Sequence, residues 1–94
     1  MASTGAPADL DAAISFAIEA ASLTPRADIQ LASRLDTIGI RLSQRFSHIG
    51  VAADLDEAIL FAAEAIRLTP SDHPARPGRL ERLVIRLAKR YIGC

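Results

Sequence analysis

The residues whose type and spacing best suit binding chemistry are two sets of arginines. Each set is spaced i, i+7 and i+11, which places its members on one face of a helix. Guanidinium groups in such a row could form a basic ladder for phosphate groups or an acidic peptide. The two sets are Arg34, Arg41 and Arg45, and then Arg79, Arg86 and Arg90.

Acidic residues in the segment between these two sets offer a structural role for the same arginines. Asp54, Asp56, Glu57 and Glu64 are set there against Arg67 alone. Opposite charges in successive helices commonly form ion pairs on solvated faces, and each such pair contributes little to stability. The alternation of charge therefore favours ion pairs between helices over a polyanion site.

The histidines and the cysteine form no catalytic or metal-binding pattern. His48 and His73 are far apart in the chain, and Cys94 is the only cysteine. Zinc sites need a cluster of ligands, and a nucleophile needs a base beside it. His73 directly precedes Pro74, which is typical of a turn. The glycines are scattered, so no phosphate-binding loop is present. We expect a protein that is not an enzyme and that uses no cofactor or metal.

An internal repeat determines which elements must position these side chains. The segment "DLDAAISFAIEAASLTP" starts at Asp9, and "DLDEAILFAAEAIRLTP" starts at Asp54. A shift of 45 residues aligns 9–49 with 54–94 without a gap, and 18 of the 41 aligned residues are identical. Chance would give about three or four identities. A fixed period of this length indicates stacked structural repeats.

The hydrophobic pattern predicts four helices over residues 9–24, 28–48, 54–69 and 78–92. In the second copy Ala58, Ala62 and Ala65 fall on one stripe of a helix. Leu35, Ile38 and Leu42 form a leucine-type stripe on the helix before it, as Leu80, Leu83 and Leu87 do in the second copy. No segment alternates as a strand does. Short connections make neighbouring helices antiparallel, and the alanines allow their close approach.

Local signals set the expected helix ends. Asp54 and Glu57 have the spacing of a capping box, which predicts a helix start at Asp54. Pro25 and Pro70 should stop the alanine-rich helices, and Gly50 should end the helix before it. The prolines and the glycine of "SDHPARPG" should delay the last helix to residue 78.

The alanine spacing resembles a known repeat family. Alanines at one position and then four and seven residues on, followed by proline twelve residues on, resemble the second helix of a tetratricopeptide repeat (TPR). The first helix of that family carries a Leu-Gly pair, which here is Ile38-Gly39 in one copy and Leu83-Val84 in the other. The period of 45 rather than about 34 is similar to the longer repeats of kinesin light chains. Tandem arrays in fungal proteins that end in a caspase-like CHAT domain are more similar still.

The resemblance implies a peptide groove along the first-type helices. The matching positions are Ser33, Asp36, Ile40 and Ser43, then Gly78, Glu81, Ile85 and Ala88. Family members that clamp a peptide carboxylate use asparagine where this chain has Ile40 and Ile85. The resemblance therefore implies an apolar groove, or one filled by a neighbouring helix. Packing of these residues inside a tighter superhelix is the structural alternative.

Gly5, Pro7 and the lack of bulky side chains predict a disordered tail over 1–8. The resemblance implies a TPR-like domain over 9–94, with four antiparallel helices in two tandem pairs that form a short right-handed α-solenoid. The chain opens on a second-type helix and closes on a first-type helix, so we expect a fragment of a longer array. Such an array normally needs about three units and polar caps, which predicts a weak homo-oligomer through uncapped ends.

Composition narrows the remaining partners. Eleven basic and eleven acidic side chains cancel, so the net charge attracts neither nucleic acid nor a membrane surface. A single cysteine excludes an internal disulfide and fits a reducing compartment. No secretory signal or spanning segment is recognisable, and we expect a cytoplasmic protein.

Two functions follow as expectations. The first is a non-catalytic scaffold that presents a helical groove to a protein or peptide. The second is a structural spacer or self-assembly segment that binds neighbouring repeats of itself and regulates an attached CHAT protease or NTPase domain. Binding of nucleic acid or lipid through the arginine face is a third and less favoured hypothesis.

Overall fold

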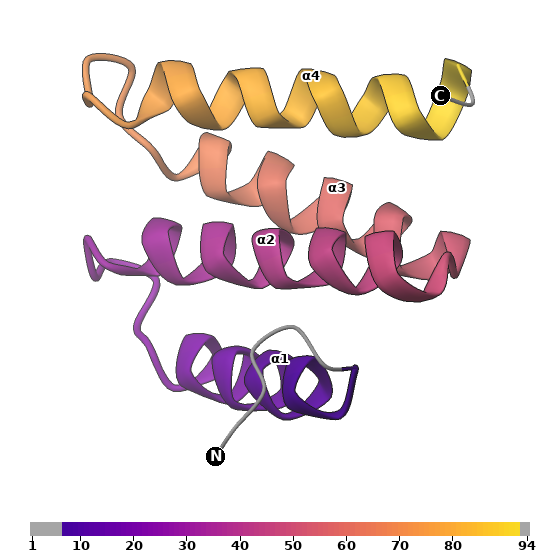
Figure 1. Ribbon diagram of the computed structural model, residues 1–94. Helices are drawn as coiled ribbons and strands as arrows, with labels where there is room; N and C mark the ends of the chain where they lie inside the picture. The colour runs from indigo at the N-terminus through magenta and orange to yellow at the C-terminus, as the bar shows by residue number, and fades with distance from the viewer. Residues whose placement is uncertain (1–6, 93–94) are drawn as a thin grey trace.

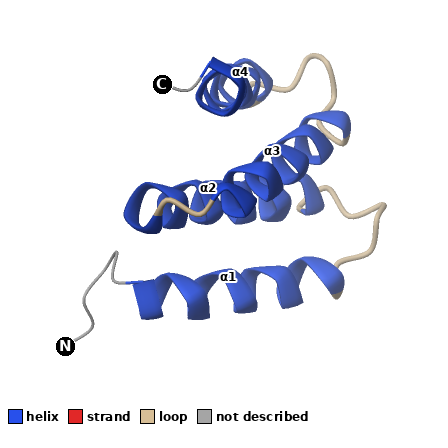
Figure 2. Ribbon diagram, turned by 90° about the vertical axis from the view of Figure 1, so that its right-hand side faces the viewer, coloured by secondary structure: helices blue, strands red, loops and turns tan. Residues whose placement is uncertain are grey.

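The chain folds into consecutive antiparallel helices. The computed structural model describes residues 7–92, with side-chain surroundings from residue 9. In that range the four helices are α1 (Pro7–Ser22), α2 (Leu31–Ile49), α3 (Ala52–Arg67) and α4 (Arg76–Ile92), and there is no strand. Each connection reverses the chain, and each helix packs on the next one (Figure 1, Figure 2). The all-α prediction is confirmed.

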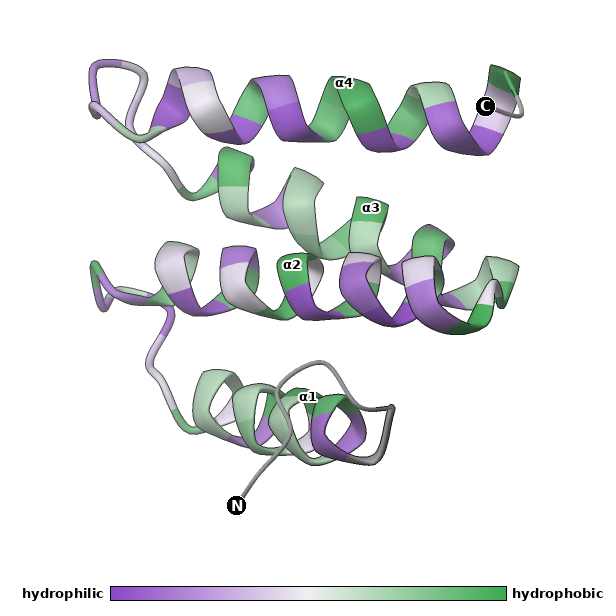
Figure 3. Ribbon diagram, in the orientation of Figure 1, coloured by the Kyte–Doolittle hydropathy of each residue, from purple (hydrophilic) through white to green (hydrophobic). Residues whose placement is uncertain are grey.

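The core lies where α2 meets α1 and α3. Ile38 and Leu42 of α2 are almost completely buried, and Ala58 and Ala65 of α3 are fully buried against them. Alanine has almost no side chain, so the two backbones come close and the larger α2 side chains fill the space between them. Figure 3 shows the difference in composition: α1 and α3 are mostly apolar, whereas α2 and α4 alternate charged and apolar residues along their length.

The predicted start of α3 at Asp54 is wrong. The helix begins at Ala52, and its N-cap is Val51, which offers no side-chain hydrogen bond. Asp54 is buried, and its two carboxylate oxygens accept hydrogen bonds from Arg45 of α2 at 3.0 and 2.9 Å. The carboxylate that was expected to cap the helix is therefore engaged by a bidentate pair with an arginine, and the alanines before it are strong helix formers.

The predicted delay of the last helix to residue 78 is also wrong. α4 begins at Arg76, and Pro77 lies in its first turn. Proline is tolerated there because the backbone N–H that it lacks has no partner in a first turn. Arg76 in addition bonds the end of α3: its Nη1 donates to the carbonyl oxygens of Ile66 at 2.9 Å and Thr69 at 2.8 Å.

Other predicted ends agree with the structure. α2 ends before Gly50, which has a φ of 82° and donates its N–H to the carbonyl oxygen of Phe46. The left-handed conformation is the one that favours glycine at this position. α1 and α3 both end before their prolines.

The predicted tail over 1–8 falls mostly on residues that the structure does not describe. Residues 1–6 lie outside the described range, as does Cys94. The backbone of residues 7 and 8 belongs to α1.

Candidate functional site

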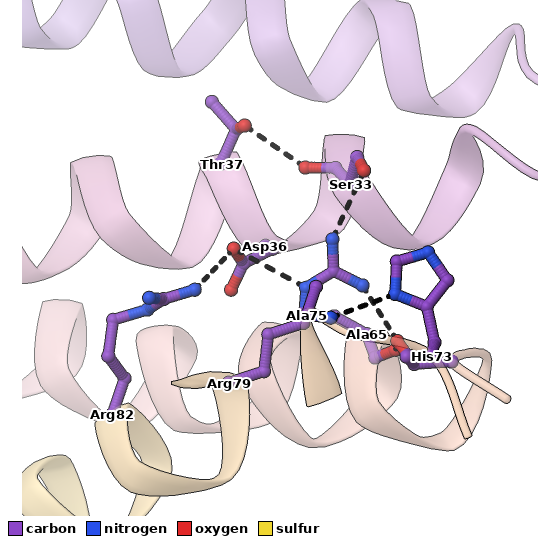
Figure 4. A network of polar contacts seen from close by, with 9 residues as sticks. Ser33, Asp36, Thr37, Ala65, His73, Ala75, Arg79 and Arg82 are labelled. Carbon is purple, nitrogen blue, oxygen red and sulfur yellow. Dashed lines mark hydrogen bonds and ion pairs between the residues drawn. The ribbon is translucent and has the colours of Figure 1, made fainter. Parts of the chain in front are cut away.

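The candidate site is a polar seam that joins α2, α4 and the α3–α4 connection. Ser33 and Asp36 of α2 lie close to Arg79 and Arg82 of α4 (Figure 4), and Thr69 of the connection bonds Arg79. Asp36 is the only carboxylate of the seam. It accepts a hydrogen bond from Arg82 Nη2 at 2.7 Å and forms an ion pair with Arg79 Nε at 3.7 Å. Asp36 is buried, so the two guanidinium groups supply the charge compensation that a buried carboxylate needs.

Arg79 joins three segments at once. Its Nη1 donates to Thr69 Oγ1 at 2.8 Å, and its Nη2 donates to Ser33 Oγ at 3.1 Å. Thr69 Oγ1 in turn donates to the carbonyl oxygen of Ala65 at the end of α3. Only 7% of Arg79 is exposed. This arginine therefore fixes α4 against α2 and the α3–α4 connection.

Arg86 continues the same row of α4 but finds no carboxylate. It is 5% exposed, and Nη1 has no hydrogen-bond partner within the described part of the chain. The guanidinium lies against Gly39 of α2, with Nη1 3.2 Å from where a Cβ would stand. Burial lowers the pKa of Arg86, and the charge of Asp36 opposes that shift. Gly39 thus provides the space that Arg86 occupies.

Arg45 of the first set and Arg90 of the second set pair across helices. Arg45 of α2 binds Asp54 of α3 and also Asp11 of α1, the latter at 2.7 Å. The hydrogen bonds that Arg45 donates to these two carboxylates raise the pKa of Arg45 well above its ordinary value. Arg90 of α4 binds Asp56 of α3 in the same way, which raises its pKa.

Within the described part of the chain, the hydrogen bonds of Arg34 and Arg41 are local. Arg34 donates to the N-cap residue Gln30 at 3.1 Å, and Arg41 donates to Gln44 of α2 at 3.3 Å. The six candidate arginines therefore do not line one open face. Arg34 and Arg41 bond nearby glutamines, and Arg86 is buried without a hydrogen-bonded carboxylate among the described residues. Arg45, Arg79 and Arg90 form ion pairs between helices. That is the structural role that the alternating charges favoured.

The groove candidates separate into a closed part and an open part. Asp36 is sealed by the seam, and the Ser33 hydroxyl is taken by Arg79. Ile40, Ser43 and Ala88 are half-buried, whereas Gly78, Glu81 and Ile85 are exposed. What stays open is therefore mainly apolar, with Glu81 as its charge.

Arg82 of the seam and a second cluster were missed in the sequence. The position of Arg82 in the first copy is Thr37, so a search for arginines that recur at one offset passes over it. Glu64 likewise bonds Arg67 of its own helix and Arg26 of the α1–α2 connection. These bonds lower the pKa of Glu64 to about 2. The comparison of the two copies did not single out Arg26, because the equivalent residue in the second copy is Ser71.

The histidine turn prediction is confirmed. His73 Nδ1 accepts the backbone N–H of Ala75 at 3.0 Å. Asp28, one repeat earlier, accepts the N–H of Gln30 at 2.8 Å through its carboxylate. The imidazole thus replaces a carboxylate as the acceptor of the same turn.

Two hollows lie near the connections. One of about 310 Å³ adjoins the seam. It is lined by the α1–α2 and α3–α4 connections, including Asp28, Ile29, Thr69 and His73. The other, of about 340 Å³, is mainly apolar and lies among α1, α2 and α3 beside Leu31, Leu35 and Phe61. Neither holds a nucleophile paired with a base. Among the described residues, no three His, Cys, Asp or Glu side chains gather as metal ligands.

No helix within residues 7–92 is both long and apolar enough to cross a membrane. Comparisons of the chain with protein-family models, with curated proteins and with solved structures gave no match.

Proposed function

We propose that the chain is a non-catalytic protein–protein interaction scaffold, built as two tandem TPR-like helix pairs in a short right-handed solenoid. Contacts that recur at the repeat distance support this architecture. The pair Arg45–Asp11 recurs as Arg90–Asp56. The bond from the Thr24 hydroxyl to Ala20 recurs between Thr69 and Ala65. Equal contacts at equal offsets are what a stack of similar helix pairs produces.

One observation carries the function: α4 exposes large apolar side chains along its length. Leu80, Val84, Ile85, Tyr91 and Ile92 are all exposed on this 17-residue helix. Exposed large apolar side chains that gather on one element mark sites of protein association. An apolar helix face accepts the apolar face of a partner helix. Ile85 is also one of the groove candidates, and the groove candidates Ile40 and Ala88 are half-buried.

Selection of peptides from a random displayed library tests the scaffold proposal. The chain and its Ile40→Asp, Ile85→Asp variant serve as parallel baits, after equal melting shows that both fold. We expect helical peptides that bind the wild type and lose at least about tenfold in affinity on the variant, because two buried apolar contacts become charged. Equal binding by the two baits, or no enriched peptide at all, contradicts a groove at these residues.

A second candidate function is a structural spacer or self-assembly segment that binds neighbouring repeats and regulates an attached CHAT protease or NTPase domain. It is favoured by α1 and α4, which expose positions whose equivalents in α3 and α2 are buried. A cytoplasmic location belongs to both proposals. In neither does the protein bind nucleic acid, a membrane, a metal or a cofactor.

A further inference from the structure

The outer faces of α1 and α4 match each other through the repeat. Ala58, Ala62 and Ala65 of α3 are 0 to 2% exposed under α2. Their equivalents in α1 are only half-buried. Leu35 of α2 is 9% exposed, whereas its equivalent Leu80 in α4 is 41% exposed. α1 therefore exposes the face that α3 buries against α2, and α4 exposes the face that α2 buries against α3. These half-buried equivalents are Ala13, Ala17 and Ala20.

Charged residues at the same two faces are complementary in the same register. Arg45 bonds two carboxylates, Asp11 and Asp54. Its equivalent Arg90 bonds one, Asp56. The carboxylate that Arg90 lacks is the one equivalent to Asp54. In a stack that continues into a second copy, Asp9 of that copy occupies this position, and Asp9 is exposed.

A second ion pair follows from the seam. Asp36 of α2 pairs with Arg79 of α4. One repeat on, Asp36 becomes Glu81, which is exposed, and Arg79 becomes Arg34 of a second copy. Arg34 Nε is buried without a hydrogen-bond partner in the described part of the chain.

We infer that α4 of one copy docks on α1 of a second copy, in the register in which α2 packs on α3. Leu80, Leu83 and Leu87 then cover Ala13, Ala17 and Ala20 of the second copy. Arg90 pairs with Asp9, and Glu81 pairs with Arg34, across the junction. The inference rests on the self-assembly candidate above and adds its register. Because the two faces differ, the interface is head-to-tail, and it leaves a free α1 and a free α4 at the ends of every assembly that does not close into a ring.

At one position of the docking face the residue is larger than its equivalent in α2, and this difference affects how closely the two copies can approach. A Cβ at Gly39 would stand 3.3 Å from the carbonyl oxygen of Ala58. The equivalent of Gly39 on the docking face is Val84, which would meet the carbonyl oxygen of Ala13 in the second copy. The valine holds the copies farther apart than α2 and α3 are, so the junction is weaker than its internal counterpart. Removal of its side chain should tighten the junction.

Sedimentation velocity of the chain from micromolar to millimolar concentration tests the inference. We expect masses that rise past the dimer. Glu81→Arg and Arg34→Glu should each weaken association about three- to tenfold, and the double variant should restore it, since the swapped charges attract again. Glu57→Arg is the matched control, because it makes the same change on an exposed site of α3 outside the junction. Val84→Gly should tighten association about tenfold.

The outcomes separate the register from the function. A monomer at every concentration overturns both the register and self-assembly. Association that ignores the Glu81 and Arg34 reversals, or that stops at a closed dimer, overturns the register and leaves self-assembly standing. Weaker association of Val84→Gly also contradicts the register, provided that circular dichroism shows an intact α4.

Discussion

At the scale of single residues, the space beside Gly39 decides what happens to a buried charge. The Arg86 guanidinium lies against Gly39, and the backbone of α3 lies just beyond it. Arg86 has a lowered pKa because water is excluded from it. Desolvation of an arginine is costly, and a side chain at residue 39 would press on both the guanidinium and the α3 backbone. Gly39 is therefore a packing residue whose role depends on a charged neighbour.

Substitution of Gly39 by alanine should destabilise the fold by about 1 kcal/mol net. Overpacking costs about 1 to 3 kcal/mol, which exceeds the gain of about 1 kcal/mol in helix propensity. Gly78→Ala is the matched control, because a Cβ there meets only Arg82 Nη1 at 3.9 Å. We expect that control to be neutral or to stabilise. Urea unfolding measures both, and equal stabilisation by the two changes would show that α2 and α3 separate freely.

Glu64 should make stability depend on acid pH. Its bonds to Arg67 and then Arg26 lower the pKa of the folded state from 4.5 to about 2. The unfolded state therefore binds the proton first, and the stabilisation is complete above about pH 4.5 and disappears as the pH falls to about 2. Thermal melting of the wild type and Glu64→Gln should differ at neutral pH and converge in that window. A gap that stays constant down to pH 2 would assign the effect to other groups.

At the scale of helices, ion pairs between elements outrank local capping. Asp54 has a capping residue's type and spacing, yet it lies inside α3 and binds Arg45 of α2. The same holds for Asp56, which binds Arg90 of α4. Arg45 and Asp54 are nine residues apart and Arg90 and Asp56 are 34 apart, so neither pair follows from a rule about one helix. α3 begins before Asp54, at two alanines, which have the highest helix propensity.

Asp54→Ser separates the two roles of this residue. Serine caps a helix as well as aspartate does, but it cannot neutralise Arg45. We expect a loss of about 1 to 3 kcal/mol, because Asp54 is buried and its partner would remain charged. Asp9→Ser, at the exposed equivalent position of α1, should change stability by less than about 0.5 kcal/mol at low concentration. Chemical denaturation compares them, and equal small losses would favour capping at both sites.

At the scale of the whole molecule, the chain is a row of helices in which each one rests mainly on its neighbour. The most buried residues gather around α2 and α3, while α4 keeps much of its apolar surface exposed. Such a row has a small interior for its length. Stability should therefore grow with each further helix that covers an outer face.

The melting temperature should rise with chain concentration. Association through the outer helices stabilises only the folded form, so mass action favours folding as the concentration increases. In dilute solution we expect a transition below roughly 60 °C, which is ordinary for a small domain. Calorimetry over a wide concentration range measures this shift. A sharp transition above that temperature in a strict monomer would contradict it.

The sequence by itself determined the helices, their number in the described range and their packing stripes. The alanine spacing in α3 and the Leu35–Leu42 stripe in α2 identify the buried faces, because a helix that buries one face must repeat its apolar residues every third or fourth position. The end of α2 at Gly50 could also be predicted from the sequence, because few residues other than glycine adopt a positive φ.

Only the tertiary structure decided what the charges do. In the structure Arg82 bonds Asp36 in the seam, and Arg86 is buried against Gly39. Asp54 accepts hydrogen bonds from Arg45. The sequence could not show these contacts, because the partners lie on different helices and their distance is set by how closely those helices pack. The strength of an ion pair depends on that distance and on how far water is excluded, and neither quantity is encoded in the spacing of residues along one helix.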